Sequence, residues 1–276
     1  MHTHDLADQL DPRHWYATNL VGVSSQLLAS IDFNDFPQRL SIAGTRFTHK
    51  GLFSFLAQSR SQVEAADMFA EYMATAFSLD KRTRCAPGST AHYSRSSYRK
   101  LLQGWGFDSN GPAGAVLKGW VESRFGIVPT FHKQPLEAFP SEAWMRYLEE
   151  KLSSRFHNNC IQLQLDILYE YAQWSSERRR AREANGALHM FGYRGMNAAE
   201  ARFVKGSVKA RHGVIRLNNL VSFSRARERA EEFGDIVVRA AIPLAKVLFF
   251  PGLLNDQVLN GEAEVLVIGG DFEVTL

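Results

Sequence analysis

The apolar positions of this sequence change their spacing about two thirds of the way along the chain. From about residue 59 to about residue 183 they recur every three or four residues, which predicts amphipathic helices. From Leu188 onward, short apolar and β-branched runs alternate with Gly, Asn, Asp and Pro, a pattern typical of strands and turns. Helices followed by strands predict an α+β fold. We therefore divide the chain into a mainly helical region, 1–183, and a mainly β region, 184–276.

Residues suited to helix ends support the helical assignment. Ser61 and Glu64 have the spacing of a capping box, which satisfies free backbone N–H groups of a first turn. Pro112 suits a first helical position, and Gly126 suits a helix end. We expect the apolar stripes of these helices to be core: Val63, Ala66, Phe69, Met73 and Phe77; Val116, Leu117, Trp120, Val121 and Phe125; Trp144, Leu148, Leu152 and Phe156; and Ile161, Leu165, Leu168 and Ala172.

The β region contains seven predicted strands and one short helix. The helix is indicated by Ala226, Ala230 and Phe233, which lie at helical spacing. The predicted strands are Leu188–Arg194, Val214–Leu217, Leu220–Phe223, Ile236–Ile242, Lys246–Phe250, Ala263–Ile268 and Phe272–Leu276.

The composition is that of an ordinary folded protein and excludes some function classes. Hydrophobic residues make up 45% of the 276 residues and charged residues 22%. The formal net charge is only +3, and a chain that binds nucleic acid over a large area usually carries a greater excess of Lys and Arg. The longest apolar stretch, Ala240–Leu254, is interrupted by Pro243, Lys246 and Pro251, so no membrane span is predicted.

Metal sites, common cofactor motifs and export are not indicated. Cys85 and Cys160 have neither the spacing of a metal site nor that of a disulfide framework, which fits a reducing cytoplasm. His2 and His4 lie at a terminus, and we predict no metal site there. The chain has no apolar signal core, no G-x-G-x-x-G, no Walker A loop, no H-E-x-x-H and no G-x-S-x-G.

Three short motifs in the β region carry candidate chemistry. Arg194 ends a predicted strand and is followed by Gly195, so a planar cation lies beside backbone that a ligand can approach. This combination suits a pyrophosphate or a carboxylate, although a strand-end Arg is also a common surface residue. Ser222 and Ser224 lie on one face of a later strand, and Ser224 could equally cap the helix that follows.

The third motif is a pair of acidic residues at the start of a strand. Glu262 and Glu264 form the only E-x-E of the chain and project from the same face. Two neighbouring carboxylates repel each other unless they are solvated or have a task. They form either a charged strand edge that discourages aggregation or a catalytic pair.

The order Arg, S-x-S, E-x-E resembles the R-S-E class of ADP-ribosyltransferases, which includes cholera-toxin-like and clostridial-toxin-like enzymes. In that class, E-x-E accompanies modification of arginine. The length, the long helical part and the phrase His-Met-Phe-Gly-Tyr-Arg-Gly-Met, 189–196, narrow the resemblance to the dinitrogenase reductase ADP-ribosyltransferase family. One departure is Phe223, where Thr is usual. That side chain should point away from the substrate.

The resemblance implies a C-terminal β-sandwich that binds NAD as a substrate. It implies that Glu264 binds a ribose hydroxyl and faces the developing cation, and that Glu262 orients the incoming guanidinium. Ser222 would support Glu264 and the nicotinamide ribose. The remaining NAD contacts that it implies are Arg194 to a phosphate, the backbone of Gly195 to the nicotinamide amide, Ser224 on the cofactor face, and Phe233 near the nicotinamide ring, with 253–261 as the loop that recognises the target.

The resemblance also implies partners, and alternatives remain open. The acceptor would be dinitrogenase reductase, the nitrogenase iron protein, and a PII-family nitrogen-signalling protein would activate the enzyme, with the helical region serving targeting and control. One alternative is an R-S-E transferase or NAD glycohydrolase with another target. A different class is a non-enzymatic regulator, suggested by the basic run at 178–182, although such a run more often is a solvated helix end.

Overall fold

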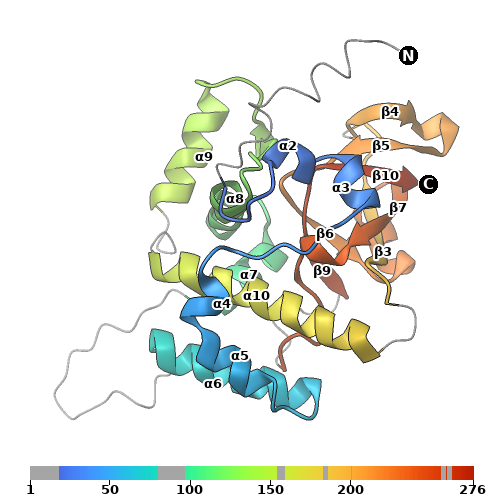
Figure 1. The fold of residues 1–276 in the computed structure, drawn as a ribbon. Helices are drawn as coiled ribbons and strands as arrows, with labels where there is room; N and C mark the ends of the chain where they lie inside the picture. The colour runs from blue at the N-terminus through green and yellow to red at the C-terminus, as the bar shows by residue number, and fades with distance from the viewer. Residues whose placement is uncertain are drawn as a thin grey trace.

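The computed structural model describes residues 19–79, 97–153, 159–182, 186–199, 201–255, 259 and 263–276 (Figure 1). Its helical part contains α2 (Ser25–Leu28), α3 (Ile31–Asp35), α4 (Thr45–Thr48), α5 (Lys50–Leu56), α6 (Gln62–Phe77), α7 (Tyr98–Phe107), α8 (Pro112–Phe125), α9 (Glu142–Ser153) and α10 (Asn159–Arg182). A small hairpin of β1 (Phe131–His132) and β2 (Gln134–Pro135) lies between α8 and α9.

The remainder of the described chain is mostly strand, which confirms the predicted α+β class. The strands are β3 (His189–Met196), β4 (Phe203–Ser207), β5 (His212–Arg216), β6 (Leu220–Ser224), β7 (Ile236–Pro243), β8 (Val247–Phe249), β9 (Glu264–Ile268) and β10 (Asp271–Thr275). Short helical segments lie between them: η2 (Val208–Ala210), α11 (Arg227–Ala230), η3 (Glu231–Phe233) and η4 (Leu244–Lys246). Each of the seven predicted strands has its counterpart, and β4 was not predicted.

Local signals at the helix ends behave as the sequence indicates. The Ser61 side chain accepts the Glu64 N–H at 3.1 Å, while the Glu64 carboxylate reaches back to the N–H of Arg60. Pro112 is the first residue of α8, and Gly126 ends it in the left-handed conformation at φ 71°. A residue with a Cβ rarely adopts that backbone conformation, so glycine is favoured there.

Two residues predicted as core are exposed. The exposed fraction of Val63 is 63% and that of Leu152 is 56%. On a helix with 3.6 residues per turn, Val63 lies roughly a quarter turn away from the face that buries Phe69 and Met73. Leu152 lies in the last turn of α9. Phe156, from the same predicted stripe as Leu152, lies outside the described residues.

The eight larger strands form one antiparallel sheet in the order β4-β5-β10-β7-β3-β6-β9-β8. Only one residue pair, Tyr193 with Ser224, joins β3 to β6. Phe223 on β6 contacts Phe272 on β10, with ring centroids 5.9 Å apart, although two other strands separate β6 from β10. The sheet therefore curls over its own core like a sandwich, and it is most weakly joined between β3 and β6.

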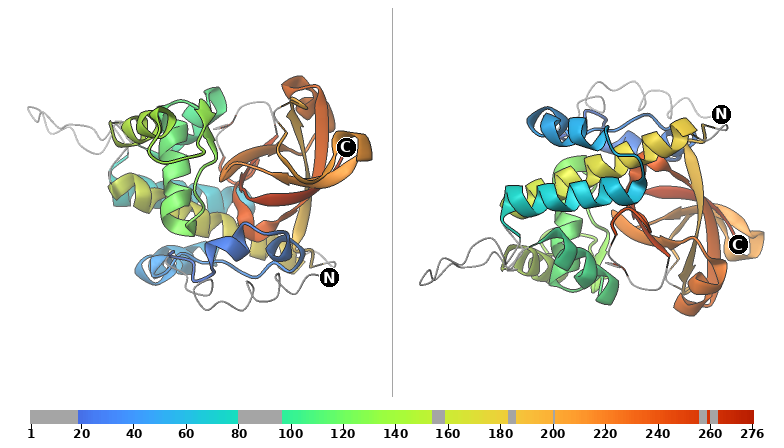
Figure 2. Two further views of the ribbon diagram at one scale, coloured as in Figure 1. Left: turned by 90° about the horizontal axis from the view of Figure 1, so that it is seen from above. Right: turned by 90° about the horizontal axis from the view of Figure 1, so that it is seen from below.

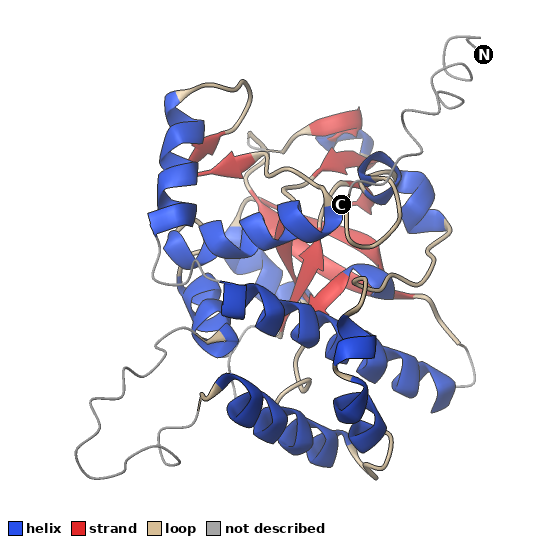
Figure 3. Cartoon of the chain, turned by 60° about the vertical axis from the view of Figure 1, so that its left-hand side comes forward, coloured by secondary structure: helices blue, strands red, loops and turns tan. Residues whose placement is uncertain are grey.

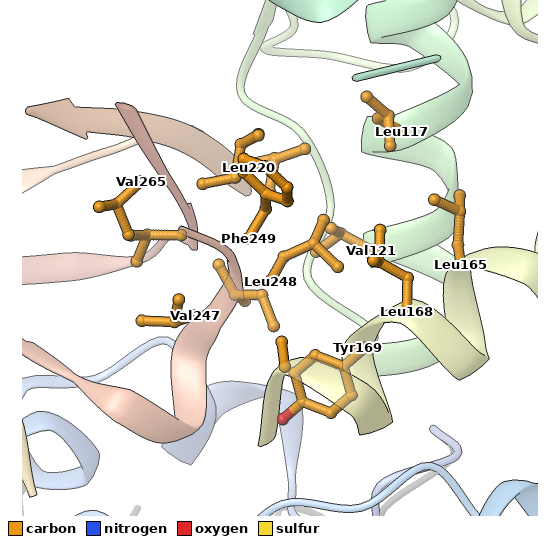
Figure 4. Packing of buried hydrophobic residues seen from close by; sticks show 14 of the residues in the cluster. Leu117, Val121, Leu165, Leu168, Tyr169, Leu220, Val247, Leu248, Phe249 and Val265 are labelled. Carbon is orange, nitrogen blue, oxygen red and sulfur yellow. The ribbon is translucent and has the colours of Figure 1, made fainter. Parts of the chain in front are cut away.

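The helices gather on one side of the molecule and the strands on the other (Figure 2). Seen from the helical side, the sheet lies behind the helices (Figure 3). Helix α10 carries Leu165 and Leu168 toward α8, and it packs against β8, an edge strand of the sheet (Figure 4). One continuous cluster of buried side chains contains residues from both parts of the chain. The division at 183/184 remains a prediction.

Helix α10 also holds the N-terminal segment through a buried carboxylate. Glu170 is completely buried and accepts the N–H of Ile42 at 2.6 Å, the hydroxyl of Ser41 at 2.9 Å and Nε of Arg46 at 2.5 Å. A buried charge is tolerated only when partners of this kind replace its water. The contact fixes residues 41–46 against the middle of α10.

The basic run at the end of α10 is partly engaged in packing. Arg178 donates to the hydroxyl and the carbonyl of Ser59, and the Arg179 guanidinium lies 5.1 Å from the ring centroid of Phe250. These contacts join α10 to the α5–α6 connection and to the end of β8.

Among the described residues, no helix has both the length and the apolar character needed to cross a membrane.

Replacing Glu170 should be far more costly than replacing a nearby half-buried acid. We expect Glu170→Ala to lower the free energy of unfolding by about 3–5 kcal/mol, because Arg46 and the Ile42 N–H lose their buried acceptor. Glu177, which pairs with Arg39 and Arg46 at a half-buried position, is the matched control. Glu177→Ala should cost less than about 1 kcal/mol. Urea denaturation measures both, and equal losses would contradict this assignment.

A buried lysine should make stability depend on pH. Lys246 is fully buried between Phe33 and Phe272, and burial lowers its pKa to about 7 while Asp271 opposes the shift. Between pH 7 and the ordinary pKa of 10.5, the unfolded chain binds more protons at this site than the folded chain. Stability should therefore rise with pH by up to about 1.4 kcal/mol per unit from this group.

Lys246→Met should remove that rise and leave the variant more stable than the parent near pH 7. Urea denaturation at pH 7, 8 and 9 measures the difference, with the exposed Lys50→Met as control. The same pH dependence in the parent and in Lys246→Met would show that Lys246 does not titrate in this range.

Candidate active site

A cavity of about 400 Å³ opens at the weak joint between β3 and β6. Its walls come from α7, β3, β6, the α11–η3 segment and the first residue of β9. The lining residues are Trp105, Gly106, Phe107, Asp108, Ser109, Tyr193, Arg194, Gly195, Met196, Asn197, Ser222, Phe223, Ser224, Ala230, Phe233 and Glu264.

The structure brings nearly all of the predicted site residues together at this cavity. Of the seven, six line it: Arg194, Gly195, Ser222, Ser224, Phe233 and Glu264. The seventh, Glu262, lies outside the described residues, as do His2, His4 and Cys85. Within the described ranges, no group of three or more His, Cys, Asp or Glu side chains could hold a metal ion.

Strand pairing determines the position of the acidic residue. β6 and β9 are antiparallel neighbours, and Glu264 is paired with Ser224. The Ser222 hydroxyl donates a hydrogen bond to Oε1 of Glu264, whose exposed fraction is only 7%. Because side chains alternate along a strand, Ser222 and Ser224 both face the cavity while the Phe223 ring packs in the core.

Arg194 supplies a desolvated positive charge next to this carboxylate. Its Nη1 donates to the Ser222 carbonyl at 2.8 Å. Burial lowers the pKa of Arg194 and the Glu264 charge opposes that shift, but a guanidinium remains a cation at any physiological pH. Within the described residues Arg194 forms no ion pair with a carboxylate within 4.0 Å. Its charge is therefore suited to an anionic ligand.

Gly195, Ser224 and Phe233 shape the wall opposite α7. A Cβ on Gly195 would lie 1.9 Å from the Ala230 carbonyl oxygen and 3.1 Å from Cβ of Phe233, so only glycine lets α11 and η3 pack this closely on β3. The Ser224 hydroxyl accepts the N–H of Ala226 at 3.1 Å. The capping position of α11 is Ala226, so the alternative in which Ser224 caps that helix is wrong.

Sequence reasoning missed the contribution of the helical part. The Trp105 indole N–H donates to the Ser222 hydroxyl at 2.8 Å and to Oε1 of Glu264 at 3.1 Å. The residues that follow, 106–109, form the lip of the cavity, where Phe107 is 94% exposed. The one available signal was Gly104-Trp105-Gly106, because two glycines in a helix are unfavourable unless close packing requires them.

This arrangement suits a substrate with an anionic group and a centre that becomes positive. Arg194 can bind the anion, and Glu264 can stabilise the developing cation. Oε1 of Glu264 accepts two hydrogen bonds, whereas Oε2 accepts none from the described residues. Oε2 therefore remains available to a substrate hydroxyl. The volume lies within the range of small-molecule sites.

Comparison with known proteins agrees with this geometry. The family model described as dinitrogenase reductase ADP-ribosyltransferase (DRAT) matches residues 18–276. The NAD(+)--dinitrogen-reductase ADP-D-ribosyltransferase of Rhodospirillum rubrum is 44% identical over 262 residues, which are 94% of this chain and 94% of that protein. No solved structure matches significantly. The chain belongs to the dinitrogenase reductase ADP-ribosyltransferase family.

Proposed function

We propose that this chain transfers ADP-ribose from NAD to an arginine of dinitrogenase reductase, the nitrogenase iron protein. The printed name of the Rhodospirillum rubrum relative describes an enzyme that uses NAD and acts on dinitrogen reductase. The observation that carries the proposal is the buried carboxylate of Glu264, hydrogen-bonded by Ser222 beside the Arg194 cation in one cavity.

The reaction breaks the bond between nicotinamide and ribose. Nicotinamide leaves with the bonding electron pair, so positive charge develops on the sugar, as in glycoside hydrolysis. A carboxylate stabilises such a cation most strongly where water is excluded, and Glu264 is held in such a place. Its Oε2 is the atom that would accept a ribose hydroxyl. Hydrogen bonds to the sugar hydroxyls strengthen as the charge grows.

Arg194 binds the phosphate side of NAD in this proposal. A guanidinium offers planar paired donors to phosphate oxygens, and Nη1 of Arg194 is already oriented by the Ser222 carbonyl. Ser224 and Phe233 contribute to the same wall, and the backbone of Gly195 would meet the nicotinamide amide. Phe233 is half-exposed at the cavity wall, where an aromatic ring can pack on the nicotinamide.

The acceptor arginine must lose a proton to a base as well as be held in position. A guanidinium has a pKa above 12 and is a poor nucleophile while charged, so a carboxylate must remove its proton as the new C–N bond forms. By the E-x-E pattern, Glu262 has this role and 253–261 is the loop that approaches the target. Both assignments rest on the family resemblance, since Glu262 lies outside the described residues.

The proposal also includes the cellular location of the chain and its activating partner. A cytoplasmic location agrees with the cysteine usage and places the chain in one compartment with its acceptor. A PII-family protein as activator, bound by the helical part, follows from the resemblance.

Incubation with labelled NAD and purified dinitrogenase reductase tests the function. We expect release of nicotinamide and label on one arginine side chain of the iron protein, located by mass spectrometry. Label on a different protein or residue type would indicate another R-S-E transferase, and nicotinamide release without label would indicate an NAD glycohydrolase. No NAD-dependent thermal shift and no nicotinamide release would favour a non-enzymatic regulator.

Glu264→Gln should abolish most of the chemistry without loss of the fold. The amide keeps the shape but not the charge, so the developing cation loses its stabilisation, and nicotinamide release should fall by about a hundredfold or more. Glu273→Gln is the matched control, because Glu273 lies on β10, is exposed and does not line the cavity. It should retain the parent rate. A Glu264→Gln enzyme that releases nicotinamide at the parent rate would rule out the role given to Glu264.

A further inference from the structure

We infer that Trp105, on helix α7, is a positioning residue for the catalytic carboxylate. The inference rests on the proposed function, because it assigns how Glu264 is held for that reaction. Through Trp105, the helical part would help to build the active site in addition to any role in targeting.

The indole N–H makes a bifurcated hydrogen bond to both members of the serine–glutamate pair. Trp105 Nε1 lies 2.8 Å from the Ser222 hydroxyl and 3.1 Å from Oε1 of Glu264. Two donors, one from β6 and one from α7, thus converge on the same carboxylate oxygen. A carboxylate fixed in this way presents its other oxygen, Oε2, in one orientation to the substrate. Such preorganisation lowers the cost of aligning the group during the reaction.

The sequence around Trp105 lets α7 come close enough to make these bonds. A Cβ on Gly104 would lie 2.6 Å from Cβ of Ala113 on α8, and a Cβ on Gly106 would lie 2.9 Å from Cδ2 of Leu259. The same Cβ on Gly106 would be 4.0 Å from Oε2 of Glu264. The two glycines therefore let α7 pack closely against Ala113 of α8 on one side and against Leu259 on the other.

A buried lysine lies over the indole ring of Trp105. Nζ of Lys118, on α8, lies 6.0 Å from the Trp105 ring and is held by Oδ1 of Asn110 at 3.0 Å and the Phe131 carbonyl at 3.1 Å. A cation at this distance from an indole face is attracted to it. With an exposed fraction of 4%, Trp105 is enclosed between this cation and the carboxylate. Its ring has one orientation, which directs the N–H at Glu264.

The bond has an electrostatic consequence that an ordinary packing contact does not have. A hydrogen bond donated to a carboxylate stabilises its ionised form. Among the described residues that line the cavity, the other titratable side chains are Arg194 and Tyr193 on β3 and Asp108 after α7, and Lys118 lies over the indole ring. None of these is changed when only the indole N–H is removed. The pH profile therefore reports on the Trp105 bond.

Trp105→Phe tests the inference because it keeps an aromatic ring and removes the N–H. We expect kcat for nicotinamide release to fall about tenfold, while the KM for NAD changes less than about twofold. The acid limb of kcat against pH should move to higher pH. Trp120→Phe is the matched control, because the Trp120 indole N–H donates to Oδ1 of Asp166 at 2.7 Å, away from the cavity. It should keep the parent kcat and acid limb.

The outcomes separate failure of this inference from failure of the proposed function. An inactive parent protein would overturn the proposed function. An active parent with an unmoved acid limb and an unchanged kcat in Trp105→Phe would overturn only the positioning role. A lower kcat with an unmoved acid limb, matched by Trp120→Phe, would reduce Trp105 to a packing residue and would also overturn it.

A second measurement tests the inference even if Trp105→Phe does not fold. The chain has five tryptophans, so the indole N–H signals of ¹⁵N-labelled protein can be assigned individually. The Trp105 signal should shift in Glu264→Gln. A signal that stays unchanged in Glu264→Gln would show that the hydrogen bond is absent.

Discussion

The site depends on how the carboxylate of Glu264 is kept charged while it is nearly buried. A carboxylate that loses its water must gain donors or lose its charge. Here the donors are the Ser222 hydroxyl and the Trp105 indole N–H, with the Arg194 cation nearby. One donor comes from the strand beside Glu264 and the other from a helix 159 residues away in sequence. The hydrogen bonding of Glu264 is therefore complete only when the helical part is docked on the sheet.

Buried charges also determine how that docking is held. Helix α10 carries two buried carboxylates that face different neighbours. Glu170 binds the N-terminal segment, whereas Asp166 accepts hydrogen bonds from Trp120 and Arg124 on α8. Helix α8 in turn packs against α7, which carries Trp105. A chain of packed helices thus runs from the centre of α10 to the cavity. The small net charge of +3 is compatible with an anionic substrate, because one desolvated Arg can supply the local positive field.

The sequence predicted the site best where the functional residues lie on strands, because side chains alternate along a strand. Alternation along a strand predicts that Ser222 and Ser224 share a face, and pairing of β6 with β9 then brings Glu264 to that face. The same reasoning could not find Trp105, because its two hydrogen bonds depend on how a helix docks on the sheet, which strand alternation does not describe. The prediction that Val63 is buried was wrong because helical spacing gives the period of the helix but not the centre of its buried face. The exposed strand β4 has too few apolar residues to show the alternation of a buried strand.

A crystal structure with an NAD analogue whose nicotinamide–ribose bond cannot be cleaved would test the central claim most directly. The account predicts a ribose hydroxyl within hydrogen-bond distance of Oε2 of Glu264, the pyrophosphate on Arg194, and the Trp105 N–H still on Oε1. An analogue bound elsewhere, or one bound in the cavity with its nicotinamide ribose away from Glu264, would contradict it.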